Sequence, residues 1–161
     1  MTAPEPGEGT GAQDTLHLDD YLPYRLSVAS NRVSRLIASL YQDRFGLSIW
    51  QWRVLAIAGA KDGLTAGEVA ARAAMDKMAV SRAVSALLGR GLITRTASRT
   101  DGRARILTLT ATGRSIYDEV APLARQQESA LLEGFSAAEV NAAQIFLRAI
   151  EARAMALTAS R

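Results

Sequence analysis

The stretch from Thr65 to Thr110 constrains the fold more than any other part of the chain. Thr65 and Glu68 form an S/T-x-x-E capping box, in which each residue satisfies a backbone amide at a helix start. Asp76 suits the first cap of a second helix, and Gly91 suits the left-handed residue that ends one. We therefore predict two short helices joined by a tight turn.

The second of these helices has two different faces. At about 100° per residue, one face is apolar and can pack on the first helix: Val80, Val84, Leu87 and Leu88. The opposite face is small, polar and basic: Met78, Ser81, Arg82, Ser85 and Gly89. Such a face can enter a major groove without a bulky obstruction. An ordinary surface helix is an equally good interpretation of this segment alone.

Two predicted strands and a charged turn follow the helices. Residues 92–96 and 105–110 are rich in Leu, Ile and Thr, and the Asp101-Gly102 pair between them is typical of a turn. Between Arg72 and Arg105 only two residues are acidic, and eight are basic: Arg72, Lys77, Arg82, Arg90, Arg95, Arg99, Arg103 and Arg105. A charge run is often only a solvated face. Its coincidence with two helices and a hairpin favours phosphate binding.

These segments carry a specific resemblance to a known family. The run DKMAVSRAVSALLGRGLITR, followed by TDGRARILTLTATGR, closely resembles the MarR family of winged-helix bacterial transcription regulators. The resemblance extends from about Tyr21 to Leu157. Its motifs are D-K-x-x-V-S-R-x-V, R-G-L-I-x-R, D-G-R and L-T-x-x-G, in this order.

The resemblance implies a mainly α fold with a small β-hairpin wing, built as a winged helix-turn-helix with terminal dimerisation helices. It implies a ligand-responsive regulator of transcription, usually a repressor. The expected boundaries are a disordered acidic tail over residues 1–18, an N-terminal dimerisation helix over 19–46, the DNA-binding domain over 47–110, and C-terminal dimerisation helices over 111–161. A homodimer of this kind presents two recognition helices to half-sites about one helical turn apart.

The resemblance also implies which residues meet DNA. Arg103 would enter the minor groove, oriented by Asp101. The full set of expected DNA-binding residues is Thr65, Lys77, Met78, Ser81, Arg82, Ser85, Arg99, Asp101 and Arg103.

Apolar stripes mark both ends of the chain. A long helix is expected from Leu22 to about Phe45-Gly46, with heptad-like spacing of its apolar residues. The last helix has a similar stripe. The stripes can pack within one chain, but we favour a homodimer interface that contains Leu22, Leu26, Leu36, Leu147 and Ile150.

Composition weighs against other classes of function. The chain of 161 residues has no cysteine and one histidine, His17, so neither a thiolate metal site nor a His-based catalytic motif is expected. We predict no cofactor, no metal and no enzymatic activity. No apolar run reaches the ~18 residues of a membrane span, and the acidic N-terminus does not look like a signal peptide, so a cytoplasmic protein is expected. A winged helix that serves only as a protein-interaction module is the alternative.

A small-molecule effector is expected from the family resemblance. Aromatic, basic and polar residues of the appropriate segments are Tyr24, Arg25, Asn31, Arg32, Trp50 and Arg53. This set suits an aromatic carboxylate or its coenzyme A thioester. Alternatively, the aromatic residues belong to the core and the arginines to the surface. The sequence does not specify the effector, the operator, the target genes or the sign of regulation.

Overall fold

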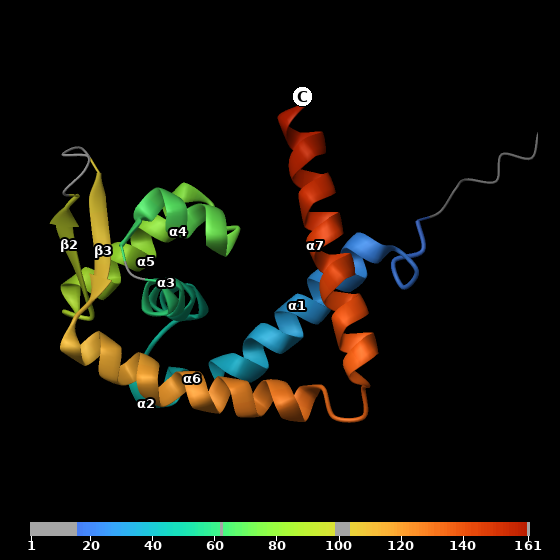
Figure 1. Ribbon diagram of the computed structural model, residues 1–161, viewed down its shortest axis with the longest axis horizontal. Helices are drawn as coiled ribbons and strands as arrows, with labels where there is room; N and C mark the ends of the chain where they lie inside the picture. Colours follow the sequence, from blue (N-terminus) through green and yellow to red (C-terminus); the bar gives the residue numbers. More distant parts are fainter. Residues whose placement is uncertain (1–15, 62, 99–103, 161) are drawn as a thin grey trace, which may run out of the picture. The chain divides into compact units, whose positions relative to one another are not determined.

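The computed structural model of the protein describes residues 16–61, 63–98 and 104–160 (Figure 1). The described residues form helices and three short strands: α1 (Leu22–Ala38), α2 (Gln42–Phe45), α3 (Ile49–Ala60), β1 (Leu64–Thr65), α4 (Ala66–Ala73), α5 (Lys77–Gly89), β2 (Ile93–Ala97), β3 (Arg105–Leu109), α6 (Ala111–Leu131) and α7 (Ala137–Ala159). The prediction of a mainly helical chain with a small β-hairpin wing is confirmed. A tail was expected over residues 1–18, and residues 1–15 of it lie outside the described residues.

The prediction of one helix from Leu22 to Phe45-Gly46 is wrong. Helix α1 ends at Ala38, and α2 begins only at Gln42. Between them Tyr41 is buried, and its ring stacks on that of Trp52 with a centroid distance of 5.3 Å. Burial of this ring against α3 stabilises the turn between the two helices. The chain divides into two compact units at this helix, residues up to Leu36 and residues from Ile37 onward.

The core of the second unit lies among α3, α4, α5 and the sheet. Helix α3 contributes Val54 and Leu55, helix α4 contributes Val69, and helix α5 contributes Val84 and Leu87, all fully buried. Figure 1 shows these three helices beside the sheet. Close packing of β-branched and leucine side chains fixes the orientation of α5 relative to α3 and α4.

The sheet is antiparallel, with strand order β1-β3-β2. Leu107 of β3 is fully buried and pairs with Leu64 of β1 on one side and with Arg95 of β2 on the other. The hairpin of β2 and β3 was predicted from the sequence, but β1 was not. A strand of two residues has no periodicity to detect, and it forms only because β3 offers it hydrogen-bonding groups.

The capping box predicted at Thr65 is confirmed, and α3, α6 and α7 also begin with side-chain caps. Ser48, Thr65 and Ser136 each form a complete capping box at the start of α3, α4 and α7. Thr110 caps α6 by accepting a hydrogen bond from the backbone N–H of Gly113 at 3.0 Å. These caps satisfy amides that have no partner within the helix.

The first turn of α6 is pressed against the start of β2. The hydroxyl of Thr110 donates to the carbonyl of Gly91 at 2.7 Å, and the backbone N–H of Thr110 donates to the carbonyl of Leu92 at 3.1 Å. Gly113 is buried there, and a Cβ atom on it would stand 1.9 Å from the Leu92 carbonyl oxygen. Glycine at this position allows the helix to meet the base of the wing.

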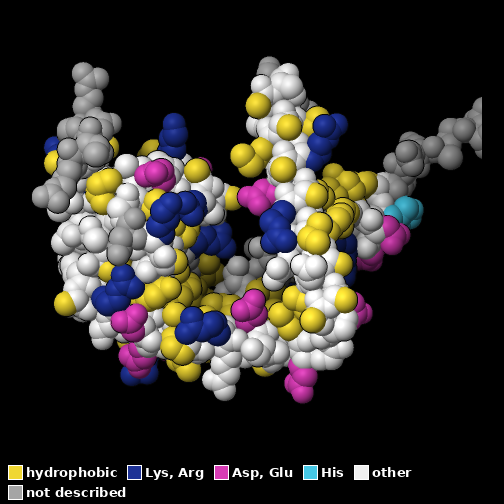
Figure 2. Space-filling model, in the orientation of Figure 1, with side chains coloured by type: hydrophobic (Ala, Val, Ile, Leu, Met, Phe, Trp, Pro, Cys, Tyr) yellow, Lys and Arg dark blue, Asp and Glu magenta, His cyan; other side chains and the backbone are white. Residues whose placement is uncertain are grey.

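Helix α7 has a different character. None of its residues, Ala137–Ala159, all of which the structure describes, is buried in the isolated chain. Ile145, Phe146 and Leu147 are each about half exposed, and Met155 is 67% exposed. Figure 2 shows hydrophobic side chains, in yellow, along this helix. An apolar helix left uncovered by its own chain is typical of an interaction surface.

No helix among the described residues is both long enough and apolar enough to span a membrane.

Candidate nucleic-acid interface

Helix α5 is anchored at both ends. The carboxylate of Asp76 accepts a hydrogen bond from the backbone N–H of Ala79 at 2.8 Å, which confirms the predicted cap. At the other end Gly91 has φ +64°, and the N–H of Leu92 donates to the carbonyl of Leu87 at 2.9 Å. This pattern of a left-handed glycine and a returning hydrogen bond is a Schellman-type stop.

The two faces of α5 are as the sequence predicts. Val80, Ala83, Val84 and Leu87 are buried against α3 and α4. Five predicted DNA-binding residues are exposed: Lys77, Met78, Ser81, Arg82 and Ser85. Met78 is 66% exposed. The exposed face therefore combines two cations, two hydroxyls and one flexible apolar side chain, a composition suited to phosphates and base edges.

A cleft of about 240 Å³ separates the exposed sides of α4 and α5. Lys77 and Ser81 of α5 line it together with Gly67 at the start of α4. Arg95 of β2 also lines this cleft, although the sequence prediction counted it only as one of the surrounding charges. In the sequence, Arg95 lies between Thr94 and Thr96 in a predicted strand, and this position was the available signal that its side chain is exposed. Only the fold shows that it lines the cleft beside α4 and α5.

Thr65 lies at this side of the domain, and its side chain already has partners. Its hydroxyl donates to the Glu68 carboxylate at 2.8 Å and accepts from the Glu68 backbone N–H at 3.2 Å. Hydrogen bonds from the backbone N–H and hydroxyl of Thr65 hold the pKa of Glu68 below its ordinary value. Thr65 therefore has a capping role, and its contact with DNA stays a prediction.

Arg90, one of the eight basic residues between Arg72 and Arg105, has hydrogen-bond partners within the fold. Its guanidinium donates to the carbonyl oxygens of Phe45 and Gly46, at 3.0 Å for Gly46. These carbonyls end α2, where Gly46 adopts φ +58°. The Arg90 side chain thus connects the end of α5 to the segment that precedes α3 through two hydrogen bonds.

Replacing Arg90 with methionine is expected to lower the free energy of unfolding by about 1–2 kcal/mol, since two hydrogen bonds from a charged donor are lost at an exposed site. The affinity of the folded protein for DNA should stay within about twofold, a small change on the scale where 1.4 kcal/mol is tenfold. Thermal unfolding and DNA titration measure the two effects. Arg72→Met, on the exposed side of α4, is the matched control. A large loss of DNA affinity with unchanged stability would contradict this assignment.

The tip of the wing lies outside the described residues. The backbone N–H of Ser98 donates to the carbonyl of Ala104 at 2.9 Å, so the hairpin pairs as far as these two residues. The predicted contacts of Arg99, Asp101 and Arg103 with DNA therefore stay predictions.

The predicted effector residues fall on two helices. Tyr24, Arg25, Asn31 and Arg32 are exposed on α1, in the compact unit that ends at Leu36. Trp50 and Arg53 lie on α3, in the other unit, with the Arg53 guanidinium 5.4 Å from the centre of the Trp50 ring. The structure thus pairs the last two residues with each other. The contribution of the first four stays a prediction.

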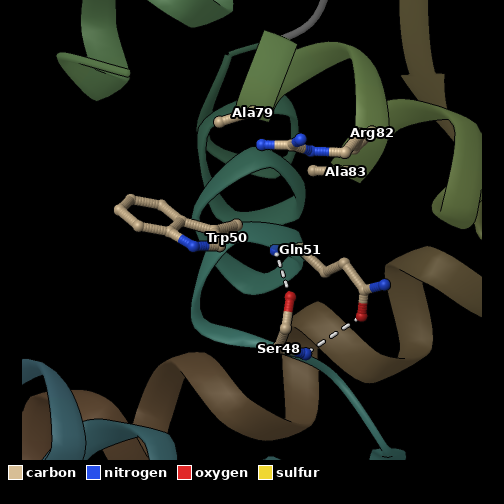
Figure 3. Close-up of a pocket in the computed structure, with 6 residues that line it drawn as sticks. All are labelled: Ser48, Trp50, Gln51, Ala79, Arg82 and Ala83. Carbon is tan, nitrogen blue, oxygen red and sulfur yellow. Dashed lines mark hydrogen bonds between the residues drawn. The ribbon is translucent and has the colours of Figure 1, made fainter. Parts of the chain in front are cut away.

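A small pocket lies between α3 and α5, with a volume of about 130 Å³ (Figure 3). It is lined by Ser48, Trp50, Gln51, Ala79, Arg82 and Ala83. In Figure 3 the Arg82 side chain extends from α5 in front of α3, toward the side on which Trp50 lies. Trp50 is 49% exposed, so the interpretation of this residue as core is wrong.

Trp52, the other tryptophan of α3, packs within the fold. Trp52 lies between Tyr41 and Tyr117, with ring centroids at 5.3 and 6.3 Å. Burial raises the pKa of Tyr41, and the nearby Arg53 guanidinium partly offsets this effect. Stacked rings of this kind hold α3 against the chain before it and against α6.

Among the described residues, no three His, Cys, Asp or Glu side chains are grouped so that they could hold a metal ion.

Comparison with known proteins identifies the fold. A model of the MarR family matches residues 45–104, which run from the end of α2 to the wing. The chain belongs to the MarR family. No match was found among curated proteins.

Solved structures of MarR-type regulators extend the likeness beyond the matched domain. A MarR-family regulator from Silicibacter pomeroyi is 29% identical, with 85% of this chain and 92% of that chain covered and a TM-score of 0.73. A probable transcriptional regulator from Pseudomonas aeruginosa is 30% identical, with coverage of 85% and 98% and a TM-score of 0.67. The transcriptional repressor CouR, bound to a 23-mer DNA duplex, is 29% identical, with coverage of 83% and 94% and a TM-score of 0.71.

MarR proteins are DNA-binding transcription regulators with a winged helix, so the described surface around α5 is that of a DNA-binding domain.

Proposed function

We propose that this MarR protein is a homodimeric repressor that binds a pseudo-palindromic operator and is released by a small aromatic acid or its coenzyme A thioester. The observation that carries the proposal is the exposed face of α5. A helix packed by Val80, Val84 and Leu87 presents Arg82 and Met78 outward on a rigid support. Rigid placement of a few side chains is what base recognition requires.

The similarity to CouR supports repression through duplex DNA, because that relative is a repressor bound to a DNA duplex. The cleft lined by Lys77, Ser81 and Arg95 independently supports binding to duplex DNA. Two cations and a hydroxyl beside the start of a helix suit a phosphate. We assign Arg95 to phosphate contact and Arg82 to a base edge. Arg103 of the wing is proposed to enter the minor groove, with Asp101 fixing its orientation.

The dimer is proposed from the apolar surface of the terminal helices. Leu147 is 49% exposed in the isolated chain, and Leu22 and Leu36 of α1 are 43% and 38% exposed. With Leu26 and Ile150 they form the proposed interface. A two-fold dimer covers such a surface and also duplicates α5, which matches the two half-sites of a palindrome.

Replacing Arg82 with alanine is expected to lower discrimination between operator and unrelated duplex by about 1–3 kcal/mol, because a bidentate base contact is lost. Fluorescence anisotropy with both duplexes, at two salt concentrations, measures the change. Arg125→Ala, which removes the same charge from α6, is the control and should leave discrimination intact. Equal loss on both duplexes would make Arg82 a phosphate contact only. Absence of DNA binding by the unaltered protein would favour the protein-interaction alternative.

A further inference from the structure

Helix α6 packs directly on the backbone of α3 at Gly59. A Cβ atom on Gly59 would lie 2.6 Å from Cδ2 and 2.8 Å from Cγ of Tyr117, so the Tyr117 ring fills the space that any other side chain would need. Gly59 lies within α3, and its φ is not among the left-handed values found at other glycines. Glycine is a poor helix former, and here the packed ring, not the backbone conformation, accounts for it.

Two further residues hold the Tyr117 ring in place. Arg114, one turn earlier on α6, donates from Nη1 to the carbonyl oxygen of Gly59 at 3.0 Å. Its guanidinium also lies 5.3 Å from the centre of the Tyr117 ring. Trp52, about two turns before Gly59 on α3, stacks on Tyr117 with a centroid distance of 6.3 Å and an interplanar angle of 25°. We call Gly59, Arg114 and Tyr117 together the α3–α6 contact.

Only the first half of α6 is packed on the DNA-binding domain. Ile116 is partly buried against the core, and Val120 is fully buried. From Ala121 to Leu131 no residue is buried, although α6 continues as one helix to Leu131. The α3–α6 contact is therefore where the helix that leads toward α7 is attached to the domain that carries α5.

Helix α6 has a second point of attachment at its first turn, where Gly113 packs on the backbone of Leu92. Two points of attachment define the direction of a helix, whereas a single point would leave it free to pivot. The contact at Gly113 holds the start of α6, and the contact of Tyr117 with Gly59, one turn later, fixes where the helix points.

We propose that the α3–α6 contact, by fixing the direction of α6, determines which spacing between the two DNA half-sites the dimer accepts. The inference rests on the proposed function, since it concerns how the proposed dimer measures its operator. Tyr117, Arg114 and Gly59 act here as positioning residues, because they set the place of α5 relative to the dimer helices and do not touch DNA themselves.

A small change of direction is enough to alter the spacing. From Tyr117 to Leu131, α6 extends by about 21 Å at about 1.5 Å per residue. A pivot of about 10° would displace the far end by about 3.7 Å, close to the ~3.4 Å that separates neighbouring base pairs. The closely packed ring and backbone of the α3–α6 contact resist such a pivot.

The test measures affinity for a panel of duplexes. One contains a single half-site, and the others contain inverted repeats at the selected spacing or at one base pair more or less. The unaltered protein should prefer the selected spacing by about tenfold or more. Tyr117→Leu, which removes the flat ring, should reduce this preference to about threefold or less. Its affinity for the single half-site should stay within about twofold, because α5 is not altered.

Three further variants complete the test, and thermal unfolding checks that each is folded. Gly59→Ala keeps Arg114 and Tyr117 but adds a methyl group that displaces the ring, so it should also weaken the spacing preference. Tyr117→Phe keeps the ring and should behave as the unaltered protein does. Arg90→Met, which acts at Phe45 and Gly46, controls for lower stability and should keep the preference.

A strict spacing preference that survives in both Tyr117→Leu and Gly59→Ala would overturn the proposal. Equal losses on every duplex, the single half-site included, or the same loss of preference in Arg90→Met, would also overturn it, because the effect would then be general destabilisation. The two proposals fail in different ways. If the unaltered protein binds no duplex with sequence preference, the proposed regulator function fails. If it binds an operator but accepts all three spacings equally, only the positioning role fails.

Discussion

Replacing Gly113 with alanine is expected to destabilise the protein by about 3 kcal/mol or more, at the upper end of the cost of overpacking. The new Cβ would stand 1.9 Å from the carbonyl oxygen of Leu92 and 2.9 Å from its carbon. Both are backbone atoms of the segment that begins the wing, so no side-chain rotation relieves the overlap. The Thr110 hydroxyl also holds the N–H of Gly113 at 3.0 Å, which fixes the position of the turn.

Thermal unfolding measures this effect. For a chain of this size, a loss of 3 kcal/mol corresponds to a melting temperature lower by roughly 6–12 °C. Gly89→Ala near the end of α5 is the matched control, because nothing lies within 4 Å of its Cβ position. Alanine there should stabilise the helix by about 0.5–1 kcal/mol. A Gly113→Ala protein that melts at or above the temperature of the unaltered protein would contradict the close contact between α6 and β2.

Replacing Leu147 with aspartate is expected to dissociate the proposed dimer and to remove most operator affinity. The side chain is half exposed in the isolated chain, so the folded monomer tolerates the charge. In a dimer interface an unpaired buried charge costs about 3–5 kcal/mol, and two-fold symmetry introduces it twice. Loss of the dimer separates the two recognition helices, which then bind half-sites singly.

Light scattering at micromolar concentration and operator titration test this prediction together. Asn141→Asp adds the same charge at a polar position of α7 and should leave both measurements unchanged. If Leu147→Asp remains a dimer, α7 does not form the interface. If the unaltered protein is a monomer under these conditions, the proposed dimer is wrong.

Helix caps and the two faces of α5 were predictable from the sequence because they depend on residues a few positions apart. A cap needs only a hydroxyl or carboxylate within three residues of an unpaired amide, and Ser48, Thr65, Asp76, Thr110 and Ser136 all act in this way. The two faces of α5 follow from helical spacing for the same reason.

Contacts between distant residues were not predictable in this way. The break after Ala38 depends on the burial of Tyr41 against α3, and strand β1 depends on a free edge of β3. The charge of Arg90 looked like part of a phosphate-binding patch, yet it is committed to carbonyls more than forty residues earlier in the chain. Among the predicted site residues, those of α5 are confirmed as exposed. The sequence did not predict that Arg82 and Trp50 line the same pocket, because this depends on how α5 packs on α3.

The central claim is that α5 of a dimer reads a two-fold symmetric DNA sequence. Its most direct test is selection of bound duplexes from a random library, followed by titration of the selected duplex and a scrambled one. The account predicts an inverted repeat with half-site centres about 10 base pairs apart. Two chains should bind each duplex, with a preference over the scrambled sequence of at least about a thousandfold. Recovery of no common sequence, with equal affinity for both duplexes, would contradict it.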